Sequence, residues 1–499
     1  MDAWKNQLFF GDNLDILRSG CIPVGSVDLI YLDPPFNSNA TYNILFAEKG
    51  GEKSAAQITA FDDTWHWGPE AMAAYDDVIR GDRPKLADLL QALMAFLGRN
   101  DMMAYLTMMA VRLVELHRVL KPTGSLYLHC DPTASHYLKM VLDAIFDFKN
   151  FRNEIIWAYK GGGSSKKDFP RRHDVIFRYS NSNHYNFYPD TIRIPYQAEG
   201  INRTDDSMWG RHKGTSKIYK PHPLGKVPED WWPISILNAN DPERLGYPTQ
   251  KPEALLERII NASSKKGDIV LDPFCGCGTT VTVAERLKRR WIGIDITHLA
   301  ITLIKKRLHD TFGPEELEDF EVIGEPADAK SAAALAEENR HQFEWWALGM
   351  VDAAPAQDKK KGADRGVDGV LYFQEKDDGP YHKIIVQVKS GKVNAATVRE
   401  LEGTRKQEQA KIAALLTLQP PTRPMREAAA AAEFYKPEMF PELRFPRLQI
   451  LTITELFAGR QLEYPRWVPS KTFKKAVRRY KGPTPQEQEK SYPKLPNSE

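Results

Sequence analysis

The sequence Asp33-Pro34-Pro35-Phe36 follows directly on the apolar run Val27–Leu32. This run is short and rich in branched and aromatic side chains, which predicts a buried strand of a parallel sheet. The two prolines lack the N–H groups that a strand needs, so we expect the strand to end there. Because ligands of open α/β sheets bind at the carboxyl ends of the strands, Asp33 is predicted to face a binding site.

The chemistry of the tetrapeptide favours an amino group as the ligand. Asp33 and the Pro34 carbonyl can accept both hydrogens of an –NH2 group. Phe36 offers a face on which a flat base can stack. A proline turn that only closes a buried strand is the competing interpretation of these four residues alone. A second motif, far downstream, favours the first interpretation.

That second motif is a glycine-rich turn between strands predicted at 268–271 and 291–295. It reads Asp272-Pro273-Phe274-Cys275-Gly276-Cys277-Gly278-Thr279-Thr280, and a helix is predicted to follow at 281–288. Glycines let the backbone approach a ligand closely, and the start of the helix offers free N–H groups. Asp295 ends the second strand, where an acid can bind a ribose diol. The glycine spacing departs from the dinucleotide fingerprint, which argues against NAD.

Together these motifs resemble those of the amino-methyltransferases of DNA, in the permuted β-type order that places the catalytic motif before the cofactor motif. The resemblance covers about residues 7–310. It rests on the motifs Gly11-Asp12, Asp33-Pro34-Pro35-Phe36, Tyr247-Pro248-Thr249-Gln250-Lys251-Pro252, the glycine-rich turn and Asp295. It implies a seven-stranded Rossmann-like sheet, S-adenosylmethionine as the methyl donor and double-stranded DNA as the partner.

The resemblance also implies roles for single residues. Asp33, Pro34 and Phe36 would be catalytic and would favour adenine, since relatives acting on cytosine usually carry serine in the first position. An amino-cytosine methyltransferase is the alternative. The cofactor-binding residues would be Asp12, Thr249, Lys251, Asp272, Phe274, Gly276, Gly278, Thr279 and Asp295.

The C-terminal third has a second α/β pattern. Asp368 precedes a strand predicted at 370–374, and Gln387 and Lys389 lie two residues apart, hence on one face, of a strand predicted at 384–389. Acid and amide oxygens suit Mg²⁺, and a lysine can support an attacking water. An ordinary hairpin with a solvated lysine is the alternative interpretation.

Residues 341–456 resemble the Mrr-type restriction endonucleases of the PD-(D/E)xK superfamily. By this resemblance Glu344, Asp368 and Gln387 would hold Mg²⁺, and Lys389 would act with them in catalysis. Gln387 stands where the parent pattern has a second acid. The whole chain is therefore predicted to be a modification enzyme with a fused endonuclease. The alternatives are a methyltransferase whose last domain only binds DNA, and a non-catalytic DNA-binding scaffold.

Composition is that of a soluble globular protein, with 42% hydrophobic and 27% charged residues. The net charge of +2 requires that DNA contacts come from local basic patches. Four cysteines do not make a disulfide framework in so long a chain. The absence of a signal-peptide pattern and of a membrane-length apolar run predicts a cytoplasmic protein without a membrane partner. The oligomeric state, a homodimer included, is left open.

The same patterns predict the domain organisation. An amphipathic helix is expected at 101–120, after an irregular region at 37–99 that predicts a long loop with short helices. The predicted units are a methyltransferase domain at 1–312 with its target-recognition region at about 181–246, a linker at 313–340, an endonuclease-like domain at 341–460 and a basic, disordered tail at 461–499.

Overall fold

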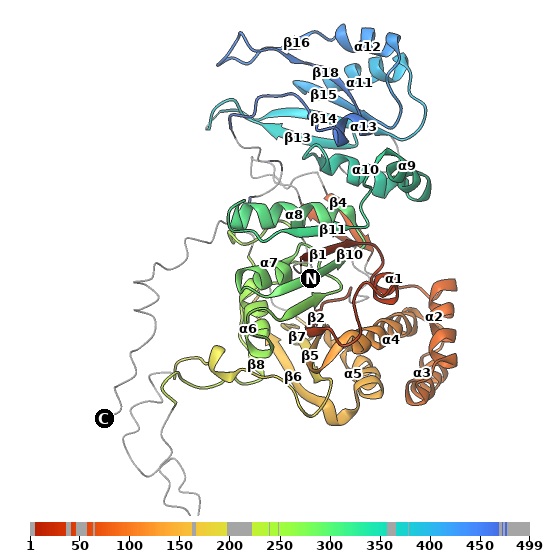
Figure 1. The fold of residues 1–499 in the computed structure, drawn as a ribbon, viewed down its shortest axis with the longest axis vertical. Coiled ribbons are helices and arrows are strands. Elements are labelled where there is room, and N and C mark those ends of the chain that lie inside the picture. Colours follow the sequence, from red (N-terminus) through yellow and green to blue (C-terminus); the bar gives the residue numbers. More distant parts are fainter. Residues whose placement is uncertain are drawn as a thin grey trace, which may run out of the picture.

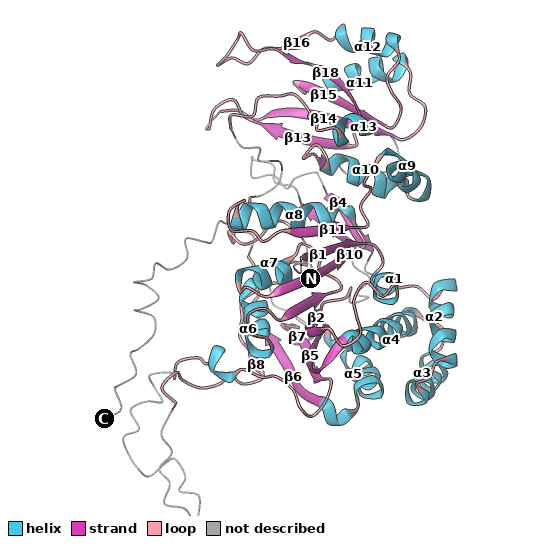
Figure 2. Ribbon diagram, viewed as in Figure 1, coloured by secondary structure: helices cyan, strands magenta, loops and turns pink. Residues whose placement is uncertain are grey.

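A computed structural model describes most of the 499-residue chain. The described residues are 5–35, 41–45, 57–62, 65–161, 166–196, 222–238, 240–247, 249–356, 366–377, 379–468, 472 and 475–476. Two α/β domains, each built on its own sheet, follow one another along the longest axis of the molecule (Figure 1, Figure 2). Part of the predicted target-recognition region, residues 197–221, lies outside the described residues.

The first domain is built on a nine-stranded sheet in the order β11-β1-β10-β9-β2-β5-β7-β6-β8. The strands are β1 (Asn6–Phe10), β2 (Val27–Leu32), β5 (Leu120–Cys130), β6 (Phe151–Ala158), β7 (His173–Ser180), β8 (Trp231–Trp232), β9 (Ile269–Asp272), β10 (Arg290–Asp295) and β11 (Phe320–Ile323). In this order, each pair of neighbouring strands from β11 through β5 is parallel. β7 is antiparallel to both β5 and β6. The predicted Rossmann-like α/β fold is confirmed, with nine strands rather than seven.

Helices cover both faces of this sheet. They are α1 (Asn13–Arg18), α2 (Pro69–Arg80), α3 (Pro84–Leu97), α4 (Asp101–Val119) and α5 (Pro132–Phe146) on one face, and α6 (Glu253–Ser263), α7 (Thr279–Arg286) and α8 (His298–Phe312) on the other. Leu17, Met109 and Leu138 belong to the apolar core of the first face, and Leu256 and Ile304 to that of the second. Because both faces are covered, every residue of β2 is buried.

The region at 37–99 contains more regular structure than the sequence pattern predicts. β3 (Thr41–Leu45) and β4 (Gln57–Asp62) pair as an antiparallel hairpin, and α2 and α3 are helices of 12 and 14 residues. Each helix begins with a proline, Pro69 or Pro84, at its start, where a missing N–H costs no hydrogen bond. The expectation of a long loop with short helices was wrong, because these prolines start helices rather than interrupt them.

The second domain is built on a five-stranded sheet in the order β12-β13-β14-β15-β18. Its strands are β12 (Ala354–Pro355), β13 (Gly369–Phe373), β14 (His382–Lys389), β15 (Ile412–Thr417) and β18 (Leu448–Thr452), with a separate pair of β16 (Phe434–Tyr435) and β17 (Phe445–Pro446). One face packs on α9 (Ala329–Glu338), α10 (Arg340–Gly349) and α13 (Ile453–Phe457), and the other on α11 (Ala395–Gln407) and α12 (Arg423–Ala430). The smaller α/β domain that the sequence predicts is thus present.

The boundaries between these parts differ in detail from the predicted ones. The stretch 313–340, predicted as a linker, contains β11, which pairs with β1, and α9, whose Ala332 lies in the core of the second domain. The described part of the predicted tail contacts both domains, and Ala476 N donates a hydrogen bond of 3.4 Å to Asp310 Oδ2 of α8 in the first domain. Tyr464 is buried in the second domain, and Tyr372 N donates a hydrogen bond of 2.9 Å to Thr472 Oγ1. Tyr464 and Thr472 are therefore parts of the second domain, whereas Ala476 meets the first.

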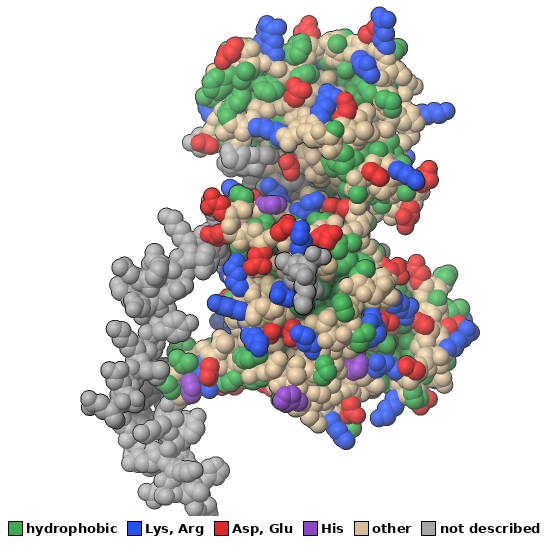
Figure 3. All heavy atoms as spheres, viewed as in Figure 1, with side chains coloured by type: hydrophobic (Ala, Val, Ile, Leu, Met, Phe, Trp, Pro, Cys, Tyr) green, Lys and Arg blue, Asp and Glu red, His purple; other side chains and the backbone are tan. Residues whose placement is uncertain are grey.

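Charged side chains of both signs are mixed over the visible face of both domains (Figure 3), in keeping with a net charge of +2. In the part of the chain that the structure describes, no helix has both the length and the apolar character needed to cross a membrane.

Candidate active site

A cavity of about 610 Å³ opens at the carboxyl edge of the large sheet. Its walls come from the segments that follow β1, β2, β9 and β10 and from residues just before α6. Of the residues predicted to form the site, it is lined by Asp12, Asp33, Pro34, Thr249, Lys251, Asp272, Phe274, Gly276, Thr279 and Asp295. Gly278 is not among the lining residues, and Phe36 lies outside the described residues. Parallel strand order brings these distant segments to one edge.

The glycine-rich turn needs its glycines for two reasons. Gly276 and Gly278 have φ angles of 50° and 75°, which L side chains rarely adopt. A Cβ at Gly278 would also lie 2.8 Å from Ile304 Cγ1 on α8. One side of the turn therefore packs closely against α8, and the backbone on its other side lines the cavity.

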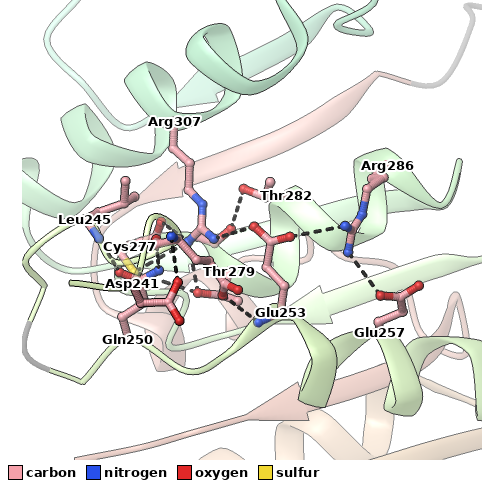
Figure 4. A network of polar contacts seen from close by, with 12 residues as sticks. Asp241, Leu245, Gln250, Glu253, Glu257, Cys277, Thr279, Thr282, Arg286 and Arg307 are labelled. Atoms are coloured by element: carbon pink, nitrogen blue, oxygen red, sulfur yellow. Dashed lines mark hydrogen bonds and ion pairs between the residues drawn. The ribbon is translucent and has the colours of Figure 1, made fainter. Parts of the chain in front are cut away.

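A buried cation supports the turn from behind (Figure 4). Arg307, whose side chain is 2% exposed, donates to Thr279 Oγ1 at 2.9 Å and to the Cys277 carbonyl at 3.2 Å. It also pairs with Glu253 at 3.1 Å, and Arg286 pairs with the other oxygen of Glu253 at 3.2 Å. The sequence analysis missed this group. The feature of the sequence that could have revealed this group is a cation on the apolar side of α8.

Two acids flank the turn, of which Asp272 is buried and Asp295 is half-buried. Asp295 Oδ2 accepts a hydrogen bond of 2.9 Å from Gly276 N, and its Oδ1 accepts from the backbone and hydroxyl of Thr297, each at 2.9 Å. Burial raises the pKa of Asp295 to about 6. Asp272 accepts from Phe274 N at 3.0 Å, and burial raises its pKa to about 7. Both carboxyls thus titrate close to neutral pH.

Asp12 has two roles in the structure. It caps α1 by accepting a hydrogen bond of 2.7 Å from Leu14 N, and it lines the cavity. Arg112 of α4, nearly fully buried, pairs with Asp12 at 2.8 Å and donates to Asn13 Oδ1 at 2.7 Å. Asn13 in turn donates to the Pro273 carbonyl at 2.8 Å. This series of contacts connects the turn after β1 to the turn after β9.

Asp33 is bound on one side only. Lys251 Nζ donates to Asp33 Oδ2 at 2.5 Å, and the two side chains are 12% and 14% exposed, respectively. The second oxygen, Asp33 Oδ1, is buried, and no hydrogen-bond donor among the described residues reaches it. A buried acceptor without a donor is costly, so it marks a place where a ligand N–H would fit.

Behind Asp33 lies a buried polar group that the sequence analysis did not identify. His129 of β5 is fully buried, with Nδ1 2.9 Å from the Tyr31 hydroxyl and 3.8 Å from Asp33 Oδ1. Its Nε2 lies 3.1 Å from Asp174 Oδ2, and the Tyr159 hydroxyl donates to Asp174 Oδ1 at 3.3 Å. Burial opposes ionisation of Asp174, but hydrogen bonding to His129 and its charge hold the pKa of Asp174 below its ordinary value. No local sequence pattern marks residues that meet only through the β5–β7 pairing.

Of the residues predicted to form the second site, Asp368 lies just before β13, Gln387 and Lys389 lie on β14, and Glu344 lies on α10. The pairing of Gly369 with Val386 places Asp368 opposite Gln387, and Asp368 Oδ2 accepts a hydrogen bond of 2.8 Å from Val388 N. Gln387 Oε1 is buried, and no described donor reaches it. Lys389, two residues further along, shares the face of Gln387.

Glu344 is not brought to that face by its helix. Phe343 and Trp346 of α10 share a core with Val386 and Val388, whose side chains alternate with Gln387 along the strand. α10 therefore covers the opposite face of the sheet. Among the described residues, no group of three or more His, Cys, Asp or Glu side chains is arranged to hold a metal ion.

The sheet order, the glycine-rich turn and the acids at the strand ends define a Rossmann-like α/β protein with a cofactor-type cavity. The model of the N6/N4 DNA methylase family matches residues 27–306, more than half of the chain, and the chain belongs to this family. Residues 340–452 match a second family model, described as NACHT-associated inactive restriction endonuclease 1.

The chain is similar to several curated methyltransferases. It is 28% identical over 298 residues to the type II methyltransferase M.BglII of Bacillus subtilis, which covers 58% of this chain and 65% of that protein. It is 35% identical over 201 residues to M.HpaI of Haemophilus parainfluenzae, covering 40% and 58%. It is 29% identical over 303 residues to the DNA adenine methyltransferase YhdJ of Escherichia coli K12, covering 60% and 82%. The chain thus spans less than two thirds of the first two relatives.

Solved structures give more distant similarities. The PvuII DNA methyltransferase, specific for cytosine N4, is 16% identical with a TM-score of 0.36, covering 60% of this chain and 85% of that one. A complex of M1.HpyAVI with SAM is 17% identical with a TM-score of 0.34, covering 60% and 98%.

Proposed function

We propose that the protein transfers a methyl group from S-adenosylmethionine to the exocyclic amino group of adenine in double-stranded DNA. The observation that carries this proposal is the half-satisfied carboxylate of Asp33, with Oδ2 held by Lys251 and Oδ1 buried without a described donor. The amino group of a base turned out of the duplex would supply the missing N–H. The match to the DNA methylase family and the likeness to an adenine methyltransferase support the choice of substrate.

The residues around the glycine-rich turn suit the proposed donor. A carboxylate offers about four acceptor positions, and Asp295 uses three of them on Gly276 and Thr297. Asp295 also lines the cavity, where its carboxylate would accept a ribose hydroxyl of the donor. Gly276, whose backbone lines the cavity, allows close approach of the donor. When bound, S-adenosylmethionine supplies a methyl group on a positively charged sulfur, ready for attack by a nitrogen lone pair.

The protein's own part in the reaction is orientation. Asp33 and the Pro34 carbonyl would each accept one amino hydrogen, which turns the nitrogen lone pair away from them and toward the donor. Lys251 neutralises the buried charge of Asp33 and fixes its plane. Holding two reactants in line is worth several orders of magnitude in rate. Phe36 is proposed to stack on the base.

The experiment is methyl transfer in vitro. Purified full-length protein is incubated with S-adenosylmethionine labelled in its methyl group and with plasmid DNA, and the nucleosides are then separated. We expect the label in N6-methyldeoxyadenosine. Label in N4-methyldeoxycytidine would favour the amino-cytosine alternative, and no label in DNA would contradict the proposal.

For the second domain, the predicted Mg²⁺-dependent cleavage by Asp368, Gln387 and Lys389 with Glu344 remains a prediction. Two findings argue against it: the matching family is described as inactive, and α10 covers the face opposite to Gln387. We therefore propose the alternative, that this domain contributes DNA binding without cutting.

Nicking assays separate these two roles. Wild type and Lys389→Ala are incubated with methylated and unmethylated plasmid, with Mg²⁺ and with a chelator. We expect no cutting by either protein. Cutting by wild type that requires Mg²⁺ and is lost in Lys389→Ala would establish the endonuclease instead.

A further inference from the structure

The connection between β6 and β7 lies at the edge of the sheet that carries Asp33. β7 begins beside the end of β5, with Val175 paired to Cys130, and β6 ends beside the start of β7, with Ala158 paired to His173. Tyr159 N donates to the Arg172 carbonyl at 3.0 Å and closes the base of the connection. Tyr159 also lines the cavity, so the base of the connection lies at the rim of the cavity.

This connection presents an aromatic side chain to solvent. Phe169 is 98% exposed, the highest value among the large hydrophobic residues that the structure describes. A single exposed apolar residue is common on protein surfaces and means little by itself. Here it is followed by Pro170, which restricts the residue before it to extended conformations. The ring is therefore presented from a stiffened backbone.

The surroundings of Phe169 are basic. Within the described part of the connection, the cations Lys166, Lys167, Arg171 and Arg172 outnumber the one acid, Asp168. Arg172 lies across the backbone at Gly161, where a Cβ would come within 2.9 Å of its guanidinium. Cations of this kind pair with phosphates and hold a segment against a duplex. The cations can bind the phosphates of the DNA backbone. The apolar ring between them is then well placed to enter the stack of bases.

We propose that Phe169 enters the DNA duplex and fills the place that the target base leaves when it turns into the cavity. The inference rests on the proposed function, because it supposes that a base is turned out. Turning a base out breaks its pairing and stacking on both neighbours. An apolar wedge between the neighbouring bases restores part of that stacking, as in other proteins that insert such side chains. Phe169 therefore lowers the cost of bringing the amino group to Asp33.

The experiment compares two substrates that differ only in the cost of turning the base out. Both are duplexes that contain the methylated sequence once it is known. In one the target adenine is paired with thymine, and in the other it faces an abasic site. Phe169→Ala is expected to lower kcat/KM on the paired duplex by roughly 10- to 100-fold, since stacking on one aromatic ring is lost. On the abasic duplex the loss should be less than about threefold.

Two further variants complete the design. Phe169→Trp keeps a stacking face and should keep most of the rate on both duplexes. Phe96→Ala is the matched control, since Phe96 is 76% exposed near the end of α3 and takes no part in the proposed site. It should behave like wild type. A 2-aminopurine placed at the target position should brighten with wild type and much less with Phe169→Ala.

An equal loss by Phe169→Ala on both duplexes, or no loss on either, would overturn the wedge role while leaving the methyltransferase intact. Wild type that methylates neither duplex would contradict the proposed function itself.

Discussion

Lys251 Nζ lies 2.5 Å from Asp33 Oδ2, and both side chains are largely buried. Lys251 stands just before α6, while Asp33 directly follows β2, so the contact joins two segments that are far apart in the chain. A buried charge needs a partner, and removing one member of such a pair is strongly destabilising. The ion pair should therefore contribute to the stability of the fold as well as to the proposed catalytic site.

The first prediction concerns this pair. Lys251→Met should lower the free energy of unfolding by about 3 kcal/mol, because it leaves Asp33 charged and unpaired. The double variant Asp33→Asn with Lys251→Met should regain most of that stability, yet should not methylate DNA. Thermal denaturation and methyl transfer measured on the same preparations check this. A single variant as stable as wild type would show that the pair is not a stabilising contact.

A second prediction addresses the polar group behind Asp33. Asp174→Asn removes the charge that holds His129, which lies 3.8 Å from Asp33 Oδ1. We expect kcat to fall about tenfold while KM for DNA and donor affinity stay unchanged, because Asp174 acts through the position of Asp33. The pH profile of kcat should also shift. A rise in KM with kcat unchanged would instead make Asp174 a DNA contact.

Donor affinity should depend on pH. Burial raises the pKa of Asp295 to about 6, so below that pH the protonated carboxyl loses an acceptor and affinity should fall by about tenfold per pH unit. Asp295→Asn should bind weakly and without this dependence. Calorimetry between about pH 5 and about pH 8, the range in which this carboxyl changes charge, measures the donor affinity.

Unfolding in acid does not explain such a fall. An acid whose folded pKa is raised binds more protons in the folded state, so its contribution to stability increases as the pH falls from about 6 toward 4. Donor affinity and this contribution thus move in opposite directions. Asp272→Asn is the control, since the pKa of Asp272 is raised to about 7 by burial and Asp295 remains intact. If that variant lost the pH dependence, the assignment to Asp295 would fail.

The fourth prediction concerns Arg307. Arg307→Met should lower the free energy of unfolding by about 3–5 kcal/mol and weaken donor binding, because Glu253 and the glycine-rich turn lose a fully buried cation. Arg286→Met is the matched control, since Arg286 is 17% exposed and leaves the turn bonded to Arg307. Denaturant unfolding of both variants measures the difference. Equal losses would mean that Arg307 has no special role at the turn.

The sequence predicts those parts of the site that follow directly on an apolar run. Asp33 directly follows a buried strand, Asp272 and Asp295 each end one, and parallel strands bring their carboxyl ends together. His129 and Arg307 could not be found in this way. Each lies inside an element among apolar neighbours, and its partner comes from another element, so only the packing reveals it.

Proline accounts for the main error in the fold. Pro69 and Pro84 suggest a loop when they are read as interruptions, but each occupies the beginning of a helix. In the second domain the strand pattern of the sequence predicts that Asp368 lies beside Gln387. Two strands adjacent in the chain are enough to determine this position, because they pair with each other. The position of Glu344 depends on which face α10 covers, and no local pattern fixes that face.

The most direct test of the central claim is single-molecule sequencing of DNA from cells that express wild type or Asp33→Ala. We expect N6-methyladenine at one recurring sequence with wild type and none with Asp33→Ala, while calorimetry shows that the variant still binds the donor. N6-methyladenine at the same sequence with Asp33→Ala, or no modified base with either protein, would contradict it.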